Sequence, residues 1–158
     1  MQGDVDIRKV KQTDMPRVVE LWKEFMDFHS SFDTFYSRSR DGHNNFRKWI
    51  EKELESDSAE LFVADYCGEV IGYIKIQVSQ YPPVFQLKEH GMISDAAVAE
   101  EYRRKGIGEA LYKRAMEWFE DRGIQRVELR VANVNPVASG FWRKMGFRPY
   151  MTTMFRET

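Results

Sequence analysis

The sequence has little of what marks secreted, membrane-spanning or nucleic-acid-binding proteins. A single cysteine, Cys67, excludes an internal disulfide and is typical of a reducing compartment. No run approaches the ~20 consecutive apolar residues that a membrane-spanning helix needs, and the polar first ten residues do not resemble a signal peptide. The formal net charge is only −1, so general attraction to nucleic acid or to acidic lipid is not expected. We therefore expect a cytoplasmic protein with no nucleic-acid or membrane partner.

Residues that commonly bind metals are also few. The three histidines, at positions 29, 43 and 90, are scattered and lack the spacing of metal ligands, so no metal site is predicted. Cys67 falls in a predicted turn without an evident base, which argues against a nucleophilic role. No repeat, low-complexity tract or long linker divides the 158 residues, and we expect one domain over residues 1–158.

The first half of the chain alternates between helical and strand periodicity. After Thr13, a predicted N-cap, apolar residues recur at helical spacing as far as about residue 28. Two β-rich runs then surround a short turn at Cys67-Gly68, which is typical of a hairpin. The predicted elements are a strand at 5–10, a helix from 14 to about 28, a loop at 29–42, a helix at about 43–55, and strands at 60–66 and 69–78.

The second half has the order strand, helix, strand, helix, which implies some parallel pairing and a mixed α/β class with a central sheet. The last helix has Asn135 as N-cap and Pro136 at its first position. We expect it to bury Val137, Phe141 and Met145. The predicted elements are a strand at 92–99, a helix from 107 to a stop at Gly123, a strand at 126–131, the helix from 136 to Gly146, and one or two short strands within 147–155.

Three cations precede the predicted helix at residue 107, in the stretch RRKGIG at 103–108. Positive charge is unfavourable at a helix N-terminus, but the unpaired amides of the first turn form an anion site, and three cations strengthen it. Gly106 and Gly108 leave the backbone accessible to a ligand such as a pyrophosphate. The stretch is neither a Walker A loop nor a G-x-G-x-x-G motif. A basic surface turn with ordinary glycines remains the alternative.

The run AVAEEYRRKGIGEAL resembles motif A of the GNAT superfamily of acyl-CoA-dependent N-acyltransferases, R/Q-x-x-G-x-G/A, with Arg103, Gly106 and Gly108 at the matching positions. The turn YCGEVIGYI and the ending ASGFWRKMGF are also similar to family segments. The resemblance implies a central mixed, mostly antiparallel, twisted sheet of six to seven strands. The sheet would be splayed at the fourth and fifth strands and flanked by about four helices.

The resemblance also implies acetyl-CoA as co-substrate, without a metal. Backbone amides of the motif A turn would hold the pyrophosphate, and the preceding strand would bind the pantetheine arm, although small residues there also suit tight sheet packing. Asn135 would contact the cofactor, act as N-cap, or do both, and Trp142 occupies a position near the cofactor sulfur. The implied cofactor residues are Ala96, Ala97, Val98, Arg103, Arg104, Lys105, Gly106, Ile107, Gly108, Glu109, Asn135 and Trp142.

Trp142 stands where many family members have a tyrosine, and indole cannot donate a proton at ordinary pH. Tyr150 or water could protonate the departing thiolate, which is a tolerable leaving group; the alternative is a member with weakened catalysis. Asp95 matches a position that is often acidic in the family, and it is the candidate base. It could instead bind a cationic substrate or cap the backbone.

The loop at 29–42 is expected to border the acceptor site, as the segment between the first two helices does in the family. Phe32, Asp33, Phe35 and Tyr36 are its candidate acceptor residues, and a solvated loop with one anchored aromatic is the alternative. The expected function is acetyl transfer from acetyl-CoA to the primary amine of a small molecule, by direct attack in a ternary complex. The alternatives are a protein or peptide acceptor and a non-catalytic acyl-CoA-binding module. Many family members dimerise, which leaves a homodimer open.

Overall fold

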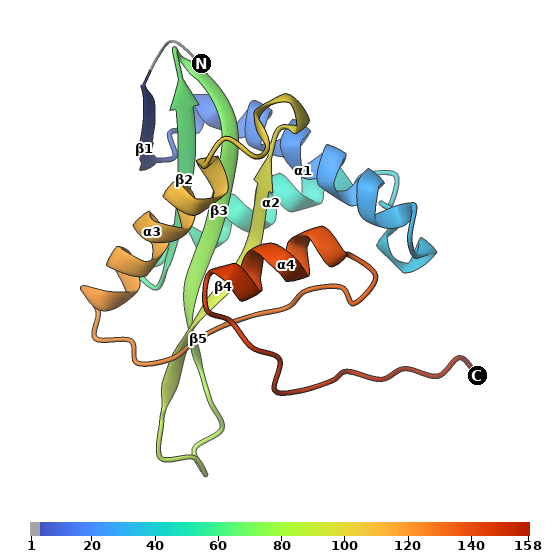
Figure 1. The fold of residues 1–158 in the computed structure, drawn as a ribbon, viewed down its shortest axis with the longest axis vertical. Coiled ribbons are helices and arrows are strands. Elements are labelled where there is room, and N and C mark those ends of the chain that lie inside the picture. The colour runs from blue at the N-terminus through green and yellow to red at the C-terminus, as the bar shows by residue number, and fades with distance from the viewer. Residues whose placement is uncertain (1–3) are drawn as a thin grey trace.

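The computed structural model describes residues 4–158, in which four α-helices cover the two faces of a five-stranded sheet (Figure 1). The strand order is β1-β2-β3-β4-β5; the first three pairings are antiparallel and β4 pairs with β5 in parallel. The elements are β1 (Val5–Lys9), α1 (Met15–Ser30), α2 (Gly42–Glu53), β2 (Ala59–Tyr66), β3 (Glu69–Gln80), β4 (Glu89–Val98), α3 (Ile107–Glu120), β5 (Val127–Leu129) and α4 (Pro136–Lys144).

The sheet has an apolar layer on each face because side chains alternate along its central strands. On β3, Tyr73 packs into a cluster formed with α1 and α2, whereas Ile74 packs into a second cluster formed with α3. Figure 1 shows the same division, with α1 and α2 behind the sheet and α3 and α4 in front of it. Both apolar clusters include residues of β3 and β4, so these two strands form the centre of the packed core.

β4 departs from regular pairing on both of its edges. Toward β3, Lys75 is opposite Asp95 but Ile76 is opposite Ile93, so Ser94 is the extra residue of a β-bulge. Toward β5, pairing is confined to Gly91–Ile93 with Val127–Leu129. From Ser94 to Val98, β4 continues past the end of its pairing with β5. The backbone edge of β4 that faces β5 is therefore unpaired over these residues.

The expected class, a mixed and mostly antiparallel sheet with four flanking helices, is confirmed, but six to seven strands is wrong: residues 4–158 form five. The short strands predicted within 147–155 do not form. In Figure 1 this segment runs away from the sheet as a tail, and its Met151, Met154 and Phe155 side chains are exposed. Although its sequence suits a strand, no strand of residues 4–158 pairs with this segment.

Two predicted helix details are also wrong. Helix α1 begins at Met15 after a 3₁₀ turn at Gln12–Asp14, so Thr13 lies inside that turn and is not the N-cap. The turn forms because the Asp14 carboxylate accepts a hydrogen bond from the Lys11 amide (2.7 Å). In α4, Val137 is exposed rather than buried, since only the later turns of this short helix reach the apolar layer, where Phe141 and Met145 are half-buried.

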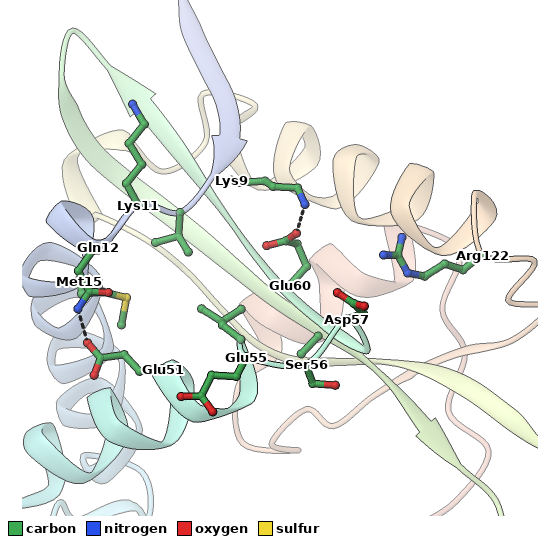
Figure 2. Close-up of a pocket in the computed structure, with 13 residues that line it drawn as sticks. Lys9, Lys11, Gln12, Met15, Glu51, Glu55, Ser56, Asp57, Glu60 and Arg122 are labelled. Atoms are coloured by element: carbon green, nitrogen blue, oxygen red, sulfur yellow. Dashed lines mark hydrogen bonds and ion pairs between the residues drawn. The ribbon is translucent and has the colours of Figure 1, made fainter.

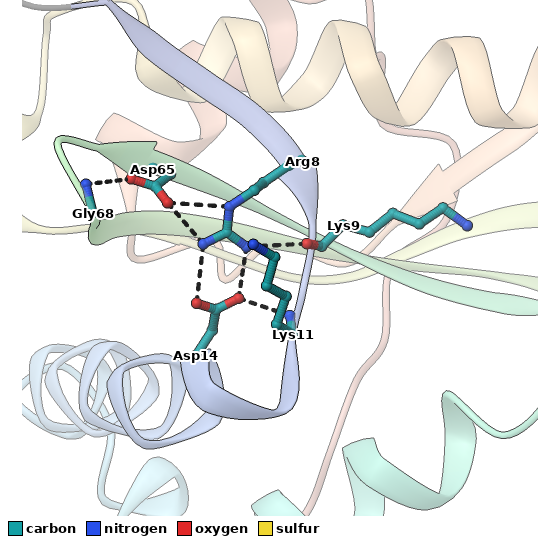
Figure 3. A network of polar contacts seen from close by, with 6 residues as sticks. All are labelled: Arg8, Lys9, Lys11, Asp14, Asp65 and Gly68. Atoms are coloured by element: carbon teal, nitrogen blue, oxygen red, sulfur yellow. Dashed lines mark hydrogen bonds and ion pairs between the residues drawn. The ribbon is translucent and has the colours of Figure 1, made fainter.

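A polar network ties the start of the chain to the sheet (Figure 3). Arg8 on β1 pairs with Asp14 at the start of α1 and with Asp65 at the end of β2, both at 2.7 Å. Asp65 also accepts from the Gly68 amide in the β2–β3 turn at 2.7 Å. The Arg8 guanidinium lowers the pKa of both carboxyl groups below the ordinary range. One side chain thus joins β1, the β2–β3 hairpin and α1.

We expect Arg8→Met to lower the free energy of unfolding at pH 7 by roughly 2 kcal/mol, because it leaves two half-enclosed carboxylates without their partner. A matched control, Arg47→Met, breaks an exposed pair with Glu51 on α2 and should cost less than about 0.5 kcal/mol. The lowered native pKa values mean that the Arg8 contribution is present above the unfolded pKa of ~3.9 and is lost as the pH falls below it. Urea unfolding across this pH range measures both effects; equal losses in the two variants would contradict the role of the network.

Candidate active site

The N-terminus of α3 opens to solvent at the end of β4. Gly106, the N-cap, has φ +83°, a left-handed conformation that glycine adopts without strain. A Cβ at Gly106 would meet no atom of the described residues within 4 Å. The first helical bond runs from the Ala110 amide to the Gly106 carbonyl (3.0 Å), so the amides of residues 107–109 have no partner within the helix. Unpaired amides with open space in front of them are the features that an anion site at a helix N-terminus requires.

The three cations before α3 do not share one role. Arg103 donates from Nε to the Val98 carbonyl (3.0 Å), and Lys105 donates from Nζ to the Glu101 carbonyl (2.7 Å). Both bonds hold the turn that joins β4 to α3. Arg104 is exposed and has φ +60°, which is uncommon for a residue with a side chain.

The other motif residues of α3 also take part in its packing. Ile107 is buried in the core. A Cβ on Gly108 would approach the Phe141 ring to 3.3 Å, so this glycine serves the contact with α4 as well as access to the backbone. Glu109 pairs with Lys113 and Lys144, each at 3.3 Å, which links α3 to α4.

The open edge of β4 presents backbone groups of alternate residues. The Ala99 amide donates to the Ile71 carbonyl on β3 (2.9 Å), and an antiparallel ladder alternates its bonds. Ala97 therefore bonds toward β3, while Ala96 and Val98 face the edge that β5 has left. The side chains of Ala96 and Val98 pack into the α3 cluster, and that of Ala97 packs into the α1–α2 cluster.

Asp95 lies on β4 just before this open edge, with its carboxylate enclosed on the α1–α2 side. Its Oδ2 accepts a hydrogen bond from the Tyr73 hydroxyl (2.9 Å), whereas Oδ1 is buried and has no hydrogen-bond partner among residues 4–158. Burial raises the Asp95 pKa to about 6, and the Tyr73 hydroxyl, the Ala96 amide and the Lys75 charge only partly oppose this rise. Burial also raises the Tyr73 pKa well above its ordinary value, so Tyr73 remains a hydrogen-bond donor.

Lys75 is opposite Asp95 on β3 and is fully buried. It forms an ion pair with Glu53 of α2, and its Nζ donates to Gln77 Oε1 (2.6 Å) and Ser94 Oγ (3.2 Å). The positive charge nearest to Asp95 is thus matched by another carboxylate. Asp95 consequently stays poorly compensated, which agrees with its raised pKa.

A pocket of about 440 Å³ adjoins Asp95 between α1, α2 and the loop that joins them. The loop contributes residues 37–39, which the sequence analysis did not single out. The helical spacing of the aromatic residues on the pocket side of α1 and α2 does not distinguish a core face from a cavity wall. The pocket is lined by Trp22, Met26, Ser37, Arg38, Ser39, Gly42, Asn45, Phe46, Trp49 and Asp95.

The four predicted acceptor residues lie outside the lining of this pocket. Asp33 caps a 3₁₀ turn by accepting from the Phe35 amide (2.9 Å). Phe35 is 84% exposed, Phe32 packs edge-on against Phe28, and Tyr36 packs against His29. Within the loop at 29–42, it is residues 37–39 and Gly42 that line this pocket.

A second pocket, of about 400 Å³, lies at the ends of β1 and α2 (Figure 2). Within it Lys9 pairs with Glu60, and Gln12 donates to Glu51 (2.8 Å). It contains no residue of the predicted site. The pocket beside Asp95 is therefore the better candidate for substrate.

Asn135 and Trp142 lie on or beside α4. Asn135 is buried; its Oδ1 caps α4 by accepting from the Ala138 amide (3.0 Å), and its Nδ2 lies 3.3 Å from His29 Nε2 of α1. This link between α4 and α1 was not predicted. Trp142 packs against Tyr112, Phe141 and Phe147.

Tyr150 is not brought to Asp95. Its hydroxyl donates to Glu128 Oε2 (3.1 Å) on β5, and Glu128 lies opposite Met92 on β4. Met92 precedes Asp95 by three residues, or roughly 10 Å of strand. Tyr150, the candidate acid, therefore lies near the Met92 end of β4, apart from Asp95, the candidate base.

Residues 18–147 match the family model described as the acetyltransferase (GNAT) family. The chain belongs to this family. GNAT acetyltransferases take their acyl group from acetyl-CoA, so the protein is an acetyl-CoA-dependent acyltransferase.

Named relatives agree with this assignment. An uncharacterized N-acetyltransferase of Archaeoglobus fulgidus is 29% identical over 91% of this chain and 93% of its own length. A putative ribosomal protein bS18-alanine N-acetyltransferase of Bacillus subtilis is 25% identical, over 94% of this chain and 84% of its own. Among solved structures, an aminoglycoside N-acetyltransferase in complex with CoA superposes with a TM-score of 0.78 at 17% identity, covering 100% of this chain and 97% of that one.

No group of three or more His, Cys, Asp or Glu side chains able to hold a metal ion occurs in the described chain. Among residues 4–158, no helix combines the length and the apolar character that crossing a bilayer requires.

We expect Asp95 to titrate with a pKa of about 6 in carboxyl-detected NMR, and Tyr73→Phe to raise that pKa further by removing the hydrogen bond that stabilises the charged form. Asp65 serves as an internal control, because its low pKa depends on Arg8 and should not respond to Tyr73→Phe. An Asp95 pKa near the ordinary ~3.9, or no response to Tyr73→Phe, would contradict the enclosed site.

Proposed function

We propose that this GNAT protein transfers the acetyl group of acetyl-CoA to the primary amine of a small molecule, by direct attack in a ternary complex. One juxtaposition carries the proposal: the wall of the acceptor-sized pocket includes Asp95, and the open backbone edge of the same strand begins at the next residue. A nucleophile in the pocket and a thioester on the edge would meet at β4. Such positioning supplies much of the rate in transfer reactions.

The co-substrate site follows from the open groups around α3 and β4. The amides of residues 104–109 would hold the pyrophosphate, assisted by the exposed Arg104, and Arg103 and Lys105 would hold the turn in shape. The backbone of Ala96 and Val98 would bond the pantetheine arm where β5 has separated. When bound, acetyl-CoA supplies an activated thioester, and the Val98 amide would polarise its carbonyl.

Asp95 would remove the proton that makes the amine unreactive. An alkylammonium group has a pKa of ~10.4 and is almost entirely protonated at pH 7. Asp95, with its pKa near 6, is largely ionised at that pH yet basic enough to accept a proton. Because Oδ1 is enclosed in the free protein, we propose transfer through one water rather than direct contact, with Tyr73 fixing the other oxygen.

The departing thiolate needs little help. A thiol pKa near ~8.5 makes it an adequate leaving group, and Trp142 cannot donate a proton. Tyr150 could act as the acid only after releasing Glu128, so we propose water as the proton donor.

A protein N-terminus is the second candidate acceptor, favoured by the relative named for alanine acetylation of a ribosomal protein. The pocket volume of about 440 Å³ favours the small molecule, since sites for such ligands span roughly 300–1,000 Å³. Thiol release measured with amines and with peptides separates the two, and release with neither would identify a non-catalytic acyl-CoA-binding module.

We expect acetyl-CoA at ~100 times its Kd to raise the free energy of unfolding by roughly 2.7 kcal/mol, and desulfo-CoA to do the same. Arg104→Glu should raise the Kd about tenfold and make the remaining affinity less dependent on salt, because it reverses a charge at the anion site. Lys48→Glu is the matched control, an equal charge change on the exposed face of α2. No stabilisation by either ligand at millimolar concentration would refute the site at α3.

We expect Asp95→Asn to lower kcat by about 10²–10⁴ while the Kd of acetyl-CoA stays near that of wild type. The wild-type kcat/KM should lose activity as the pH falls through about 6, and the variant should lack this step, because only the ionised carboxylate accepts a proton. Asp57→Asn, an exposed residue before β2, is the control. An unchanged kcat in Asp95→Asn would remove Asp95 from the mechanism.

A further inference from the structure

The walls of the pocket beside Asp95 are aromatic and lie at ring-stacking distances. Trp22 and Phe46 are stacked with centroids 4.4 Å apart and planes 10° apart, and Phe46 lies 6.2 Å from Trp49. Trp49 is 43% exposed although it is a large apolar side chain. Phe46 is only 6% exposed and is covered by its stack on Trp22. Trp22, Trp49 and the neighbouring Met26 therefore present the flat, polarisable surface that can bind another flat ring.

The pocket contains a single acidic side chain, Asp95. The other charged lining residue, Arg38, is matched by Asp27 through two hydrogen bonds of 2.8 and 3.0 Å. Lys75, enclosed beside the pocket with its Nζ 4.6 Å from the Trp49 ring centroid, is matched by Glu53. The lining therefore offers one uncompensated negative charge, which complements one ammonium group.

A polycationic acceptor does not fit this charge distribution. Each further ammonium group would lose water against aromatic walls or beside Arg38 without a carboxylate to receive it, and that desolvation is costly. A peptide acceptor would bring an amide and a carbonyl at every residue, yet the neutral polar lining is limited to Ser37, Ser39 and Asn45. Both classes leave polar groups unsatisfied.

We propose that the acceptor is a primary monoamine carried on a flat, uncharged aromatic body, with its amine toward Asp95 and its ring against the accessible surfaces of Trp22 and Trp49. This inference rests on the proposed function, because it names the substrate class of that same site. It assigns Trp22 and Trp49 as specificity-determining residues, with Phe46 holding Trp22 in place.

The test compares four acceptors by thiol release from acetyl-CoA: 2-phenylethylamine, n-butylamine, kanamycin and a peptide with an N-terminal alanine. We expect kcat/KM for 2-phenylethylamine to exceed that for n-butylamine by about tenfold, the size of one favourable aromatic contact. It should exceed the values for kanamycin and the peptide by a larger factor. A higher kcat/KM with kanamycin or the peptide would overturn the inference while leaving acetyl transfer intact.

Variants separate ring recognition from general activity. Trp49→Leu should lower kcat/KM for 2-phenylethylamine about tenfold and change that for n-butylamine little. Phe85→Leu removes an exposed aromatic in the β3–β4 loop, outside the pocket lining, and should change neither value. Equal losses for both amines in Trp49→Leu would overturn the assignment of that ring.

Failure of the proposed function has a different signature. If acetyl-CoA binds but no acceptor releases thiol, the transfer reaction is refuted, and calorimetric titration of 2-phenylethylamine into the protein–CoA complex then tests the pocket by itself. Binding that Trp49→Leu weakens would uphold the pocket as a site for a flat monoamine. No binding to the wild type would overturn it.

Discussion

The site depends on the irregular path of one strand. In a regular strand Ile93 and Asp95 would share a face, and Ile93 packs into the apolar cluster beneath α3. The extra residue at Ser94 changes the side on which the following residues project, and Asp95 meets Tyr73 on the α1–α2 face instead. The same stretch loses β5 as a partner after Ile93, so one short stretch carries both the Asp95 carboxylate and a backbone edge that β5 does not pair.

The enclosed carboxylate is a cost to the fold. Since its native pKa lies above the unfolded value, the ionised form is more stable in the unfolded chain. The stability associated with Asp95 is therefore greatest below about pH 4 and decreases as the pH rises toward 6. The opposite sign holds for Asp14 and Asp65, whose lowered pKa values favour the native state at neutral pH. A carboxyl group whose ionised form the fold destabilises, in a protein that stabilises the ionised forms of Asp14 and Asp65, is typical of a functional position.

Local signals in the sequence were sufficient for the helices, the hairpin and the turn before α3, because each of these is decided by residues close together in the chain. They were insufficient where a distant partner decides. The pattern within 147–155 suits a strand, but a strand forms only where a free sheet edge is available for pairing. Thr13 is not the N-cap because Arg8 and Asp14 stabilise a 3₁₀ turn that includes it. Trp49 belongs to an apolar stripe, and only the arrangement of α1 against α2 shows that the stripe faces a pocket.

The cations before α3 combine structural and binding demands in one short segment. A chain that leaves β4 and enters α3 exposes carbonyl groups at Val98 and Glu101, and the flanking Arg103 and Lys105 satisfy them. Their positive charge nevertheless lies in the segment that leads directly into α3, and positive charge before a helix disfavours its empty N-terminal end. A pyrophosphate would convert that unfavourable charge into attraction. The segment is therefore held in shape by bonds that do not need a ligand, and we expect its electrostatic energy to become favourable only when an anion is bound.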